Sequence, residues 1–247
     1  MALIVGMVFA TLVCGWRVHD ARIAARMLRS PADAAARDSR LLDYATRIAR
    51  PAYAANCARC HGADMRGDTA KGVPNLVDAD WLYGEGDASE IERTLLYGVR
   101  SGLARSRNLA DMPGFAMPVP YRRYPIPPLK PAQIDDVIAY LHQIEGRPAE
   151  PGAVTRGYTV FNGPGGCYDC HGEAGQGDPA VGAPDLTDAV WLYGHGRDDE
   201  LRDIIGRGRA GVCPPWLGAL SPKTIRALAL YLHDRASRAA ASKQTSR

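Results

Sequence analysis

Two short segments of the chain share the pattern Cys-x-x-Cys-His: Cys57-Ala-Arg-Cys60-His61 and Cys167-Tyr-Asp-Cys170-His171. Cysteine pairs at this spacing occur in redox-active, zinc-binding and haem-binding proteins. A zinc site would need a further pair of Cys or His ligands nearby, and neither segment is followed by one. The histidine directly after the second cysteine instead indicates covalent attachment of haem c. We therefore expect two haem c groups, held by Cys57, Cys60, Cys167 and Cys170, with His61 and His171 as proximal iron ligands.

The residues around these motifs are repeated as well. Adding 110 to a residue number maps Gly72-Val-Pro-Asn-Leu76 onto Gly182-Ala-Pro-Asp-Leu186, and Trp81-Leu-Tyr-Gly84 onto Trp191-Leu-Tyr-Gly194. Self-similarity of this kind marks a duplicated structural unit. The four aromatic residues of the second pair of segments are expected either to line the haem edges or to pack in the core.

A distal ligand completes the coordination of a haem that only carries electrons, and methionine in this position raises the potential. The first copy offers Met112 and Met117, of which Met112 is preferred because Met112-Pro aligns with Cys213-Pro of the second copy. The second copy contains no methionine. Cys213 is therefore the expected distal ligand of the second haem, with an open iron, His195 or His233 as alternatives. The sequence leaves open whether distal ligands are exchanged between the copies.

Helical patterns surround both motifs. Apolar residues recur at helical spacing from Ile134 to Leu141 and from Ile225 to Leu232, with Pro131 and Pro222 at the expected starts. The fold class is therefore all-α: two tandem class I cytochrome c domains preceded by an N-terminal membrane-anchor helix. The expected boundaries are 1–18 for the anchor, 19–44 for a helical spacer, 45–145 and 152–236 for the domains, and 237–247 for a disordered tail.

The N-terminal segment from Met1 to Trp16 is uncharged. As a helix it would reach roughly 24 Å, somewhat short of a bilayer core of about 30 Å, although flanking Arg17 could extend its reach. A cleaved signal peptide and a lipoprotein anchored through Cys14 are the alternatives. The arginines follow the apolar run, which favours a cytoplasmic location for the remainder of the chain. Haem c is attached outside the bacterial cytoplasm, so the two motifs predict that the remainder of the chain lies on the periplasmic side. The net charge of +3 gives no indication of nucleic-acid binding.

In combination these features are more specific than haem attachment alone. The segment Ala54-Ala-Asn-Cys-Ala-Arg-Cys-His-Gly62 and the paired Pro-[Asn/Asp]-Leu-x-Asp-x-x-Trp-Leu-Tyr-Gly stretches resemble the dihaem subunit III of cbb3-type cytochrome c oxidases. The resemblance covers about Leu42 to Asp234 and implies Met112 as a distal ligand. It also implies methionine where this chain has Cys213, so the potential of the corresponding haem is expected to differ.

The resemblance implies an electron relay in aerobic or microaerobic respiration, without chemistry of its own and without catalytic residues. The implied partners are the haem-copper catalytic subunit, a monohaem cytochrome subunit, and an electron donor that is either a cytochrome c or the quinol–cytochrome c reductase. The implied location is the bacterial inner membrane, with the haem domains on the periplasmic side. The alternative function is a dihaem oxidoreductase with a catalytic His/Cys haem, similar to thiosulfate dehydrogenases or to peroxidases.

Overall fold

The computed structural model describes residues 2–118 and 127–245. These residues form ten helices and no strand, and the few β-type contacts are isolated bridges. The expected helical fold class is confirmed. The helices are α1 (Ala2–Arg29), α2 (Ala32–Ala35), α3 (Ser39–Asn56), α4 (Ala58–His61), α5 (Ala88–Tyr97), α6 (Pro131–Ile144), α7 (Pro151–Phe161), α8 (Tyr168–His171), α9 (Asp198–Arg207) and α10 (Pro222–Thr245).

The N-terminal anchor is not visible as a membrane span. None of the helices in the described residues combines the length and the apolar content that crossing a membrane requires. At the other end of the chain, the predicted disordered tail from 237 is helical as far as Thr245, and residues 246–247 lie outside the described residues. Alanine is the best helix former, and Arg238 pairs with Asp234 one turn earlier, which explains the extension of α10.

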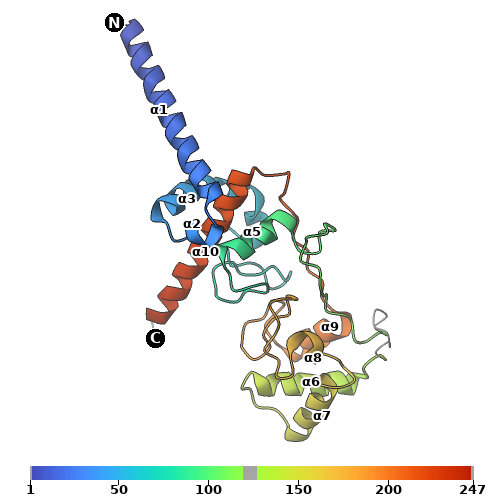
Figure 1. Ribbon diagram of the computed structural model, residues 1–247. Coiled ribbons are helices and arrows are strands. Elements are labelled where there is room, and N and C mark those ends of the chain that lie inside the picture. Colours follow the sequence, from blue (N-terminus) through green and yellow to red (C-terminus); the bar gives the residue numbers. More distant parts are fainter. Residues whose placement is uncertain (1, 119–126, 246–247) are drawn as a thin grey trace.

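A first hydrophobic core lies between α3, α5 and α10 (Figure 1). The helix α3 begins at Asp38, whose carboxylate accepts hydrogen bonds from the amides of Arg40 and Leu41 at 3.0 and 3.3 Å. Helical spacing places its apolar side chains on one face, which packs against α10. The predicted periodic positions of α10 are confirmed as buried: they are Ile225, Leu228, Ala229 and Leu232.

A second core lies between α6, α7 and α9. The helices α6 and α7 approach each other closely at Gly157, where a Cβ atom would lie 1.9 Å from the carbonyl oxygen of Asp136. The ring of Tyr140 on α6 meets that of Phe161 on α7 edge-on, with centroids 5.2 Å apart. Glycine at position 157 is therefore what allows the two helices to pack.

Replacing Gly157 with alanine is expected to destabilise the second core by about 1–3 kcal/mol, because the added methyl group meets backbone rather than a movable side chain. Urea unfolding monitored by circular dichroism measures the change. Gly146→Ala tests a glycine whose Cβ position is open but whose φ is +79°. A cost for Gly157→Ala below that of Gly146→Ala would contradict the packing argument.

The two cores do not follow the order of the sequence. The first contains residues from Met27 to Leu95 together with Ile225 to Leu232, and the second contains residues from Phe115 to Ile205. The last helix of each copy thus packs on the first helix of the other copy, α10 on α3 and α6 on α7. The helices of the predicted units 45–145 and 152–236 therefore pack in an interleaved way. Helical periodicity identifies the buried face of a helix but not the element that covers it.

Two crossing segments carry the chain between the cores, and they run side by side in Figure 1. Val99 and Cys213 exchange backbone hydrogen bonds of 2.9 and 3.1 Å, and Met112 and Arg209 exchange bonds of 3.0 and 2.9 Å. Arg226 of α10 adds a further link, because its Nε donates to Glu92 on α5 at 2.8 Å. Each copy is therefore completed by the C-terminal part of the other.

Candidate haem-attachment sites

Each Cys-x-x-Cys-His motif forms one short helical turn, α4 in the first core and α8 in the second. The amide of His61 donates to the carbonyl of Cys57 at 3.0 Å, and the amide of His171 donates to that of Cys167 at 3.0 Å. Gly62 ends the first turn with a φ of 77°, a conformation that glycine adopts without strain. One turn therefore presents both thiols and the imidazole together, as covalent haem c requires.

The two proximal histidines are held in the same way. Nδ1 of His61 lies 3.1 Å from the carbonyl oxygen of Pro74, and Nδ1 of His171 lies 3.0 Å from that of Pro184. A carbonyl only accepts, so each Nδ1 carries the proton and each Nε2 carries the lone pair. Burial lowers the pKa of both imidazoles, which favours the neutral form that binds iron. Both sites therefore fit a haem iron ligated through Nε2.

The thiols of the first turn face different surroundings. Cys57 is buried in the first core and Cys60 is exposed, and burial raises the pKa of Cys57 to about 11. In the second turn, Cys167 packs against the second core together with Trp191 and Leu186. The first cysteine of each turn therefore contacts a hydrophobic core.

Both expected distal residues lie in the part of the structure that contains the attachment turn of the opposite copy. Cys213 is half-buried, and burial together with the neighbouring Cys60 thiol raises its pKa. Met112 packs against the second core, as does Cys167. Cys213 therefore lies near the Cys57–His61 turn, and Met112 lies against the core that also contacts Cys167. Sequence order predicts Met112 for the first motif and Cys213 for the second, whereas the crossing segments bring Cys213 near the first motif and Met112 against the second core.

The alternative ligands are not positioned at the second turn. Nδ1 of His233 lies 2.9 Å from the carbonyl oxygen of Gly86 in the first half of the chain, and His195 is exposed. Met117, the other methionine considered for the first copy, is exposed, with 68% of its surface accessible.

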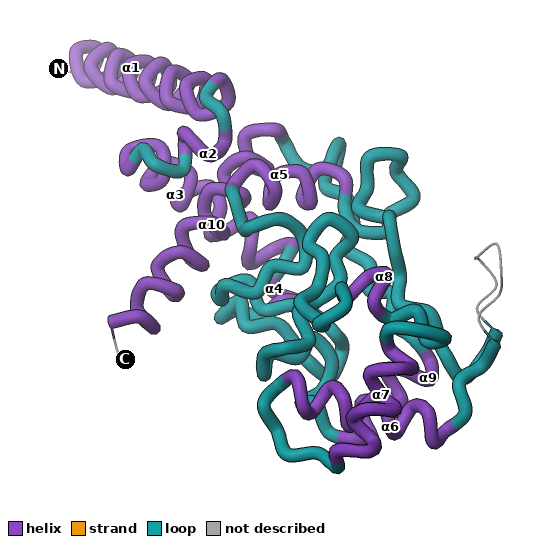
Figure 2. The backbone as a smooth tube through the Cα atoms, turned by 60° about the horizontal axis from the view of Figure 1, so that its bottom comes forward, coloured by secondary structure: helices purple, strands orange, loops and turns teal. Residues whose placement is uncertain are grey.

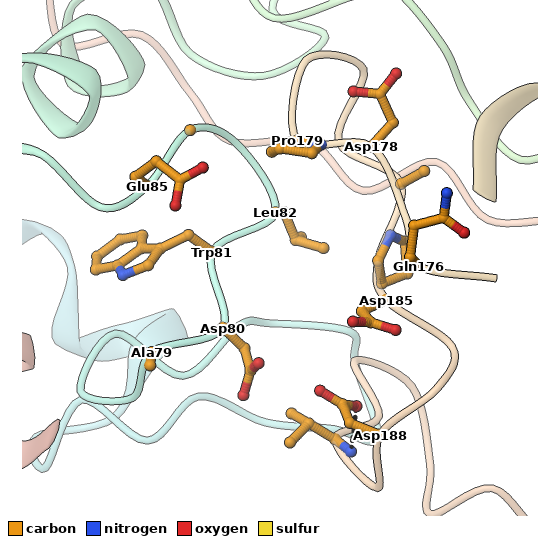
Figure 3. A pocket seen from close by; sticks show the side chains of 14 residues that line it. Ala79, Asp80, Trp81, Leu82, Glu85, Gln176, Asp178, Pro179, Asp185 and Asp188 are labelled. Carbon is orange, nitrogen blue, oxygen red and sulfur yellow. Dashed lines mark hydrogen bonds between the residues drawn. The ribbon is translucent and has the colours of Figure 1, made fainter. Parts of the chain in front are cut away.

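The Trp-Leu-Tyr-Gly segments lie where the two copies meet. Trp81 packs against the first core, and Nε1 of Trp191 donates to Glu145 at 2.8 Å. A cleft of about 220 Å³ separates the segment around Leu82 from the loop that carries Gln176 (Figure 3). Long loops fill the region between α4 and α8 (Figure 2). The cleft is lined by the carboxylates of Asp80, Glu85, Asp178, Asp185 and Asp188.

Sequence reasoning did not identify the partners of the proximal histidines or of Trp191. The repeat does mark the partners of the histidines, because Pro74 and Pro184 occupy equivalent positions in the repeated Gly-Val-Pro-Asn and Gly-Ala-Pro-Asp segments. Glu145 lies in the linker after α6 and has no such signal.

Comparison with known proteins shows the family of the chain. Residues 48–145 match the cytochrome c family, and residues 152–232 match the family described as cytochrome c oxidase, cbb3-type, subunit III. The chain is 40% identical to the cbb3-type cytochrome c oxidase subunit FixP of Bradyrhizobium sp. (strain ORS 278) over 88% of its own length and 70% of that protein. The chain belongs to the cbb3-type cytochrome c oxidase subunit III family.

Other members are similarly related to it. The chain is 36% identical to the subunit CcoP of Cereibacter sphaeroides, over 87% of this chain and 69% of that protein. It is 37% identical to the subunit CcoP of Rhodobacter capsulatus, over 85% of this chain and 68% of that protein. The cytochrome c match implies that members of this family, this chain included, bind haem c covalently.

Proposed function

We propose that the chain is the electron-transfer subunit of a cbb3-type terminal oxidase and carries two covalent haem c groups. The observation that carries the proposal is the duplicated attachment turn, with the imidazole of each turn held through Nδ1 by a proline carbonyl. Bound haem supplies one-electron redox chemistry at its iron. The protein binds and orients the haem and sets the electron affinity of the iron.

The proposed ligand sets follow the packing of the two cores. Cys57 and Cys60 hold the first haem, His61 is its proximal ligand and Cys213 its distal ligand. The second haem is held in the same way by its own motif, with the distal ligand drawn from the first copy: the residues are Cys167, Cys170, His171 and Met112. Each haem unit is then discontinuous in sequence, with one part from each copy.

The proposed partners are the haem-copper catalytic subunit, a monohaem cytochrome subunit and a donor that is a cytochrome c or the quinol–cytochrome c reductase. The relatives are subunits of cbb3-type cytochrome c oxidases from bacteria, which supports a membrane-bound bacterial complex. The haem-bearing part is proposed to face the periplasm, where haem c is attached. The uncharged residues Met1 to about Trp16 are proposed to associate with the inner membrane.

Acid–acetone extraction of the purified chain is expected to leave both haems on the protein, because thioether bonds resist this treatment whereas haem held only through iron is released. The pyridine haemochrome spectrum then gives two haems per chain. Release of either haem would contradict covalent attachment at that motif.

A second experiment tests the assembly. Affinity purification of the tagged chain from detergent-solubilised membranes is expected to recover the haem-copper subunit and oxygen consumption. The oxidoreductase alternative predicts the opposite: turnover of thiosulfate or peroxide by the isolated chain and no haem-copper partner.

A further inference from the structure

The rings of two tyrosines pack directly against glycine residues in loops of the opposite copy. A Cβ atom at Gly182 would lie 2.2 Å from Cζ of Tyr83, and one at Gly72 would lie 2.0 Å from Cζ of Tyr193. Both glycines have positive φ, 79° and 65°. Since Tyr193 is the repeat of Tyr83 and Gly182 the repeat of Gly72, the two contacts are equivalent under the 110-residue repeat.

Backbone hydrogen bonds reinforce both contacts. The amide of Gly84 donates to the carbonyl of Pro179 at 3.3 Å, and the amide of Gly194 donates to that of Thr69 at 3.0 Å. The Trp-Leu-Tyr-Gly segment of each copy is thus fastened to the other copy at the loop of residues 69–72 or 179–182.

These loops lead directly to the carbonyls that hold the proximal histidines. Pro184, two residues after Gly182, accepts from His171, and Pro74, two residues after Gly72, accepts from His61. A displacement of either glycine is therefore transmitted over two residues to a hydrogen bond on an iron-ligating imidazole.

Arginines from the crossing segments also lie against the two rings. The guanidinium carbon of Arg107 lies 4.9 Å from the Tyr83 ring centroid, and that of Arg209 lies 5.1 Å from the Tyr193 ring centroid. Arg100 lies beside Tyr83 and donates from Nε to the carbonyl of Gly211 at 2.7 Å. Each ring therefore contacts both a cation and a glycine backbone, and both contacts restrict its position.

We propose that Tyr83 and Tyr193 are positioning residues that act across the two copies, Tyr83 on the haem site of His171 and Tyr193 on that of His61. The inference rests on the proposed haem sites. A hydrogen bond from Nδ1 to a carbonyl makes the imidazole a stronger donor to iron and favours the ferric state. Loosening the loop weakens that bond, and the potential of the haem in the opposite copy rises.

The test is a spectroscopic redox titration of the full haem-bound chain carrying Tyr83→Leu. The expected result is an upward shift in the potential of the His171 haem, with the His61 haem unchanged. Tyr193→Leu is expected to give the reverse pattern. The two haem signals are assigned with the pair Cys57→Ser/Cys60→Ser and with the pair Cys167→Ser/Cys170→Ser, each of which retains one haem, and either pair suffices for assignment by difference.

Two controls separate positioning from general damage. Tyr83→Phe keeps the ring and is expected to retain the original potentials. Tyr158→Leu replaces an exposed tyrosine on α7 and is expected to leave both potentials unchanged. Haem content of the unmodified chain is measured first, because a missing covalent haem overturns the proposed function rather than this inference.

Other outcomes overturn the proposal. A shift confined to the haem of the mutated copy, an equal shift of both haems, or no shift would each show that the tyrosines do not act across the copies. Tyr83→Leu and Tyr193→Leu are independent variants, so either one that folds decides the question.

Discussion

Leu228→Ala is expected to destabilise the haem site of Cys57, Cys60 and His61, although Leu228 belongs to the second sequence copy. Its side chain is fully buried in the first core, on the face of α10 that packs against α3. Removing a buried leucine side chain costs about 2–5 kcal/mol, because the transfer free energy is lost and a cavity remains. Guanidinium unfolding of the haem-bound chain, monitored separately at each haem, measures the effect.

Leu201→Ala is the matched control. Leu201 also lies in the second copy and is 1% exposed, but it belongs to the second core. Its replacement is expected to destabilise the site of His171 by a similar amount and to leave the unfolding of the His61 site in place. If both variants destabilised only the His171 site, the interleaved arrangement of the cores would be refuted.

Cys213→Met is expected to raise the potential of the haem attached at Cys57 and Cys60. A thiolate is an anionic donor that stabilises ferric iron, whereas a methionine thioether is neutral and raises the potential. Burial raises the pKa of the Cys213 thiol. Binding as a thiolate would require Cys213 to lose its proton. The positive charge of ferric iron would favour that loss, as nearby cations lower cysteine pKa values in other proteins.

A redox titration combined with electron paramagnetic resonance of the ferric protein measures this change. Cys14→Ser replaces an exposed cysteine on α1 and is expected to leave both haems unchanged. Met112→Ala is expected to alter the His171 haem alone. If Cys213→Met altered the His171 haem, the distal ligands would follow the sequence order instead of the packing.

The local chemistry and most helices were predictable from the sequence because their signals lie within a few residues. The motif turns, the start of α6 at Pro131 and the start of α10 at Pro222 all agree with the sequence. The start of α9 at Asp198 was marked by acidic residues that suit a helix N-terminus.

Which helices pack against each other was not predictable from the sequence. The apolar stripes of α6 and α10 are alike, and either could cover α3. What decides the arrangement is the path of the segments around Val99 and Met112, which cross to the other core and pair with Cys213 and Arg209. Without a helical or strand period in those segments, the sequence offered contiguous domains as the simplest solution.

The interleaving of the cores also sets an order of events during synthesis. The second core needs only residues up to Ile205, so it can close while the chain is still being made. The first core needs Leu228 and its neighbours on α10, which are translated after Ile205 and lie far in sequence from α3. Contacts of such long sequence separation form slowly. The core that covers the Cys57–His61 turn is therefore completed after the core beside the Cys167–His171 turn.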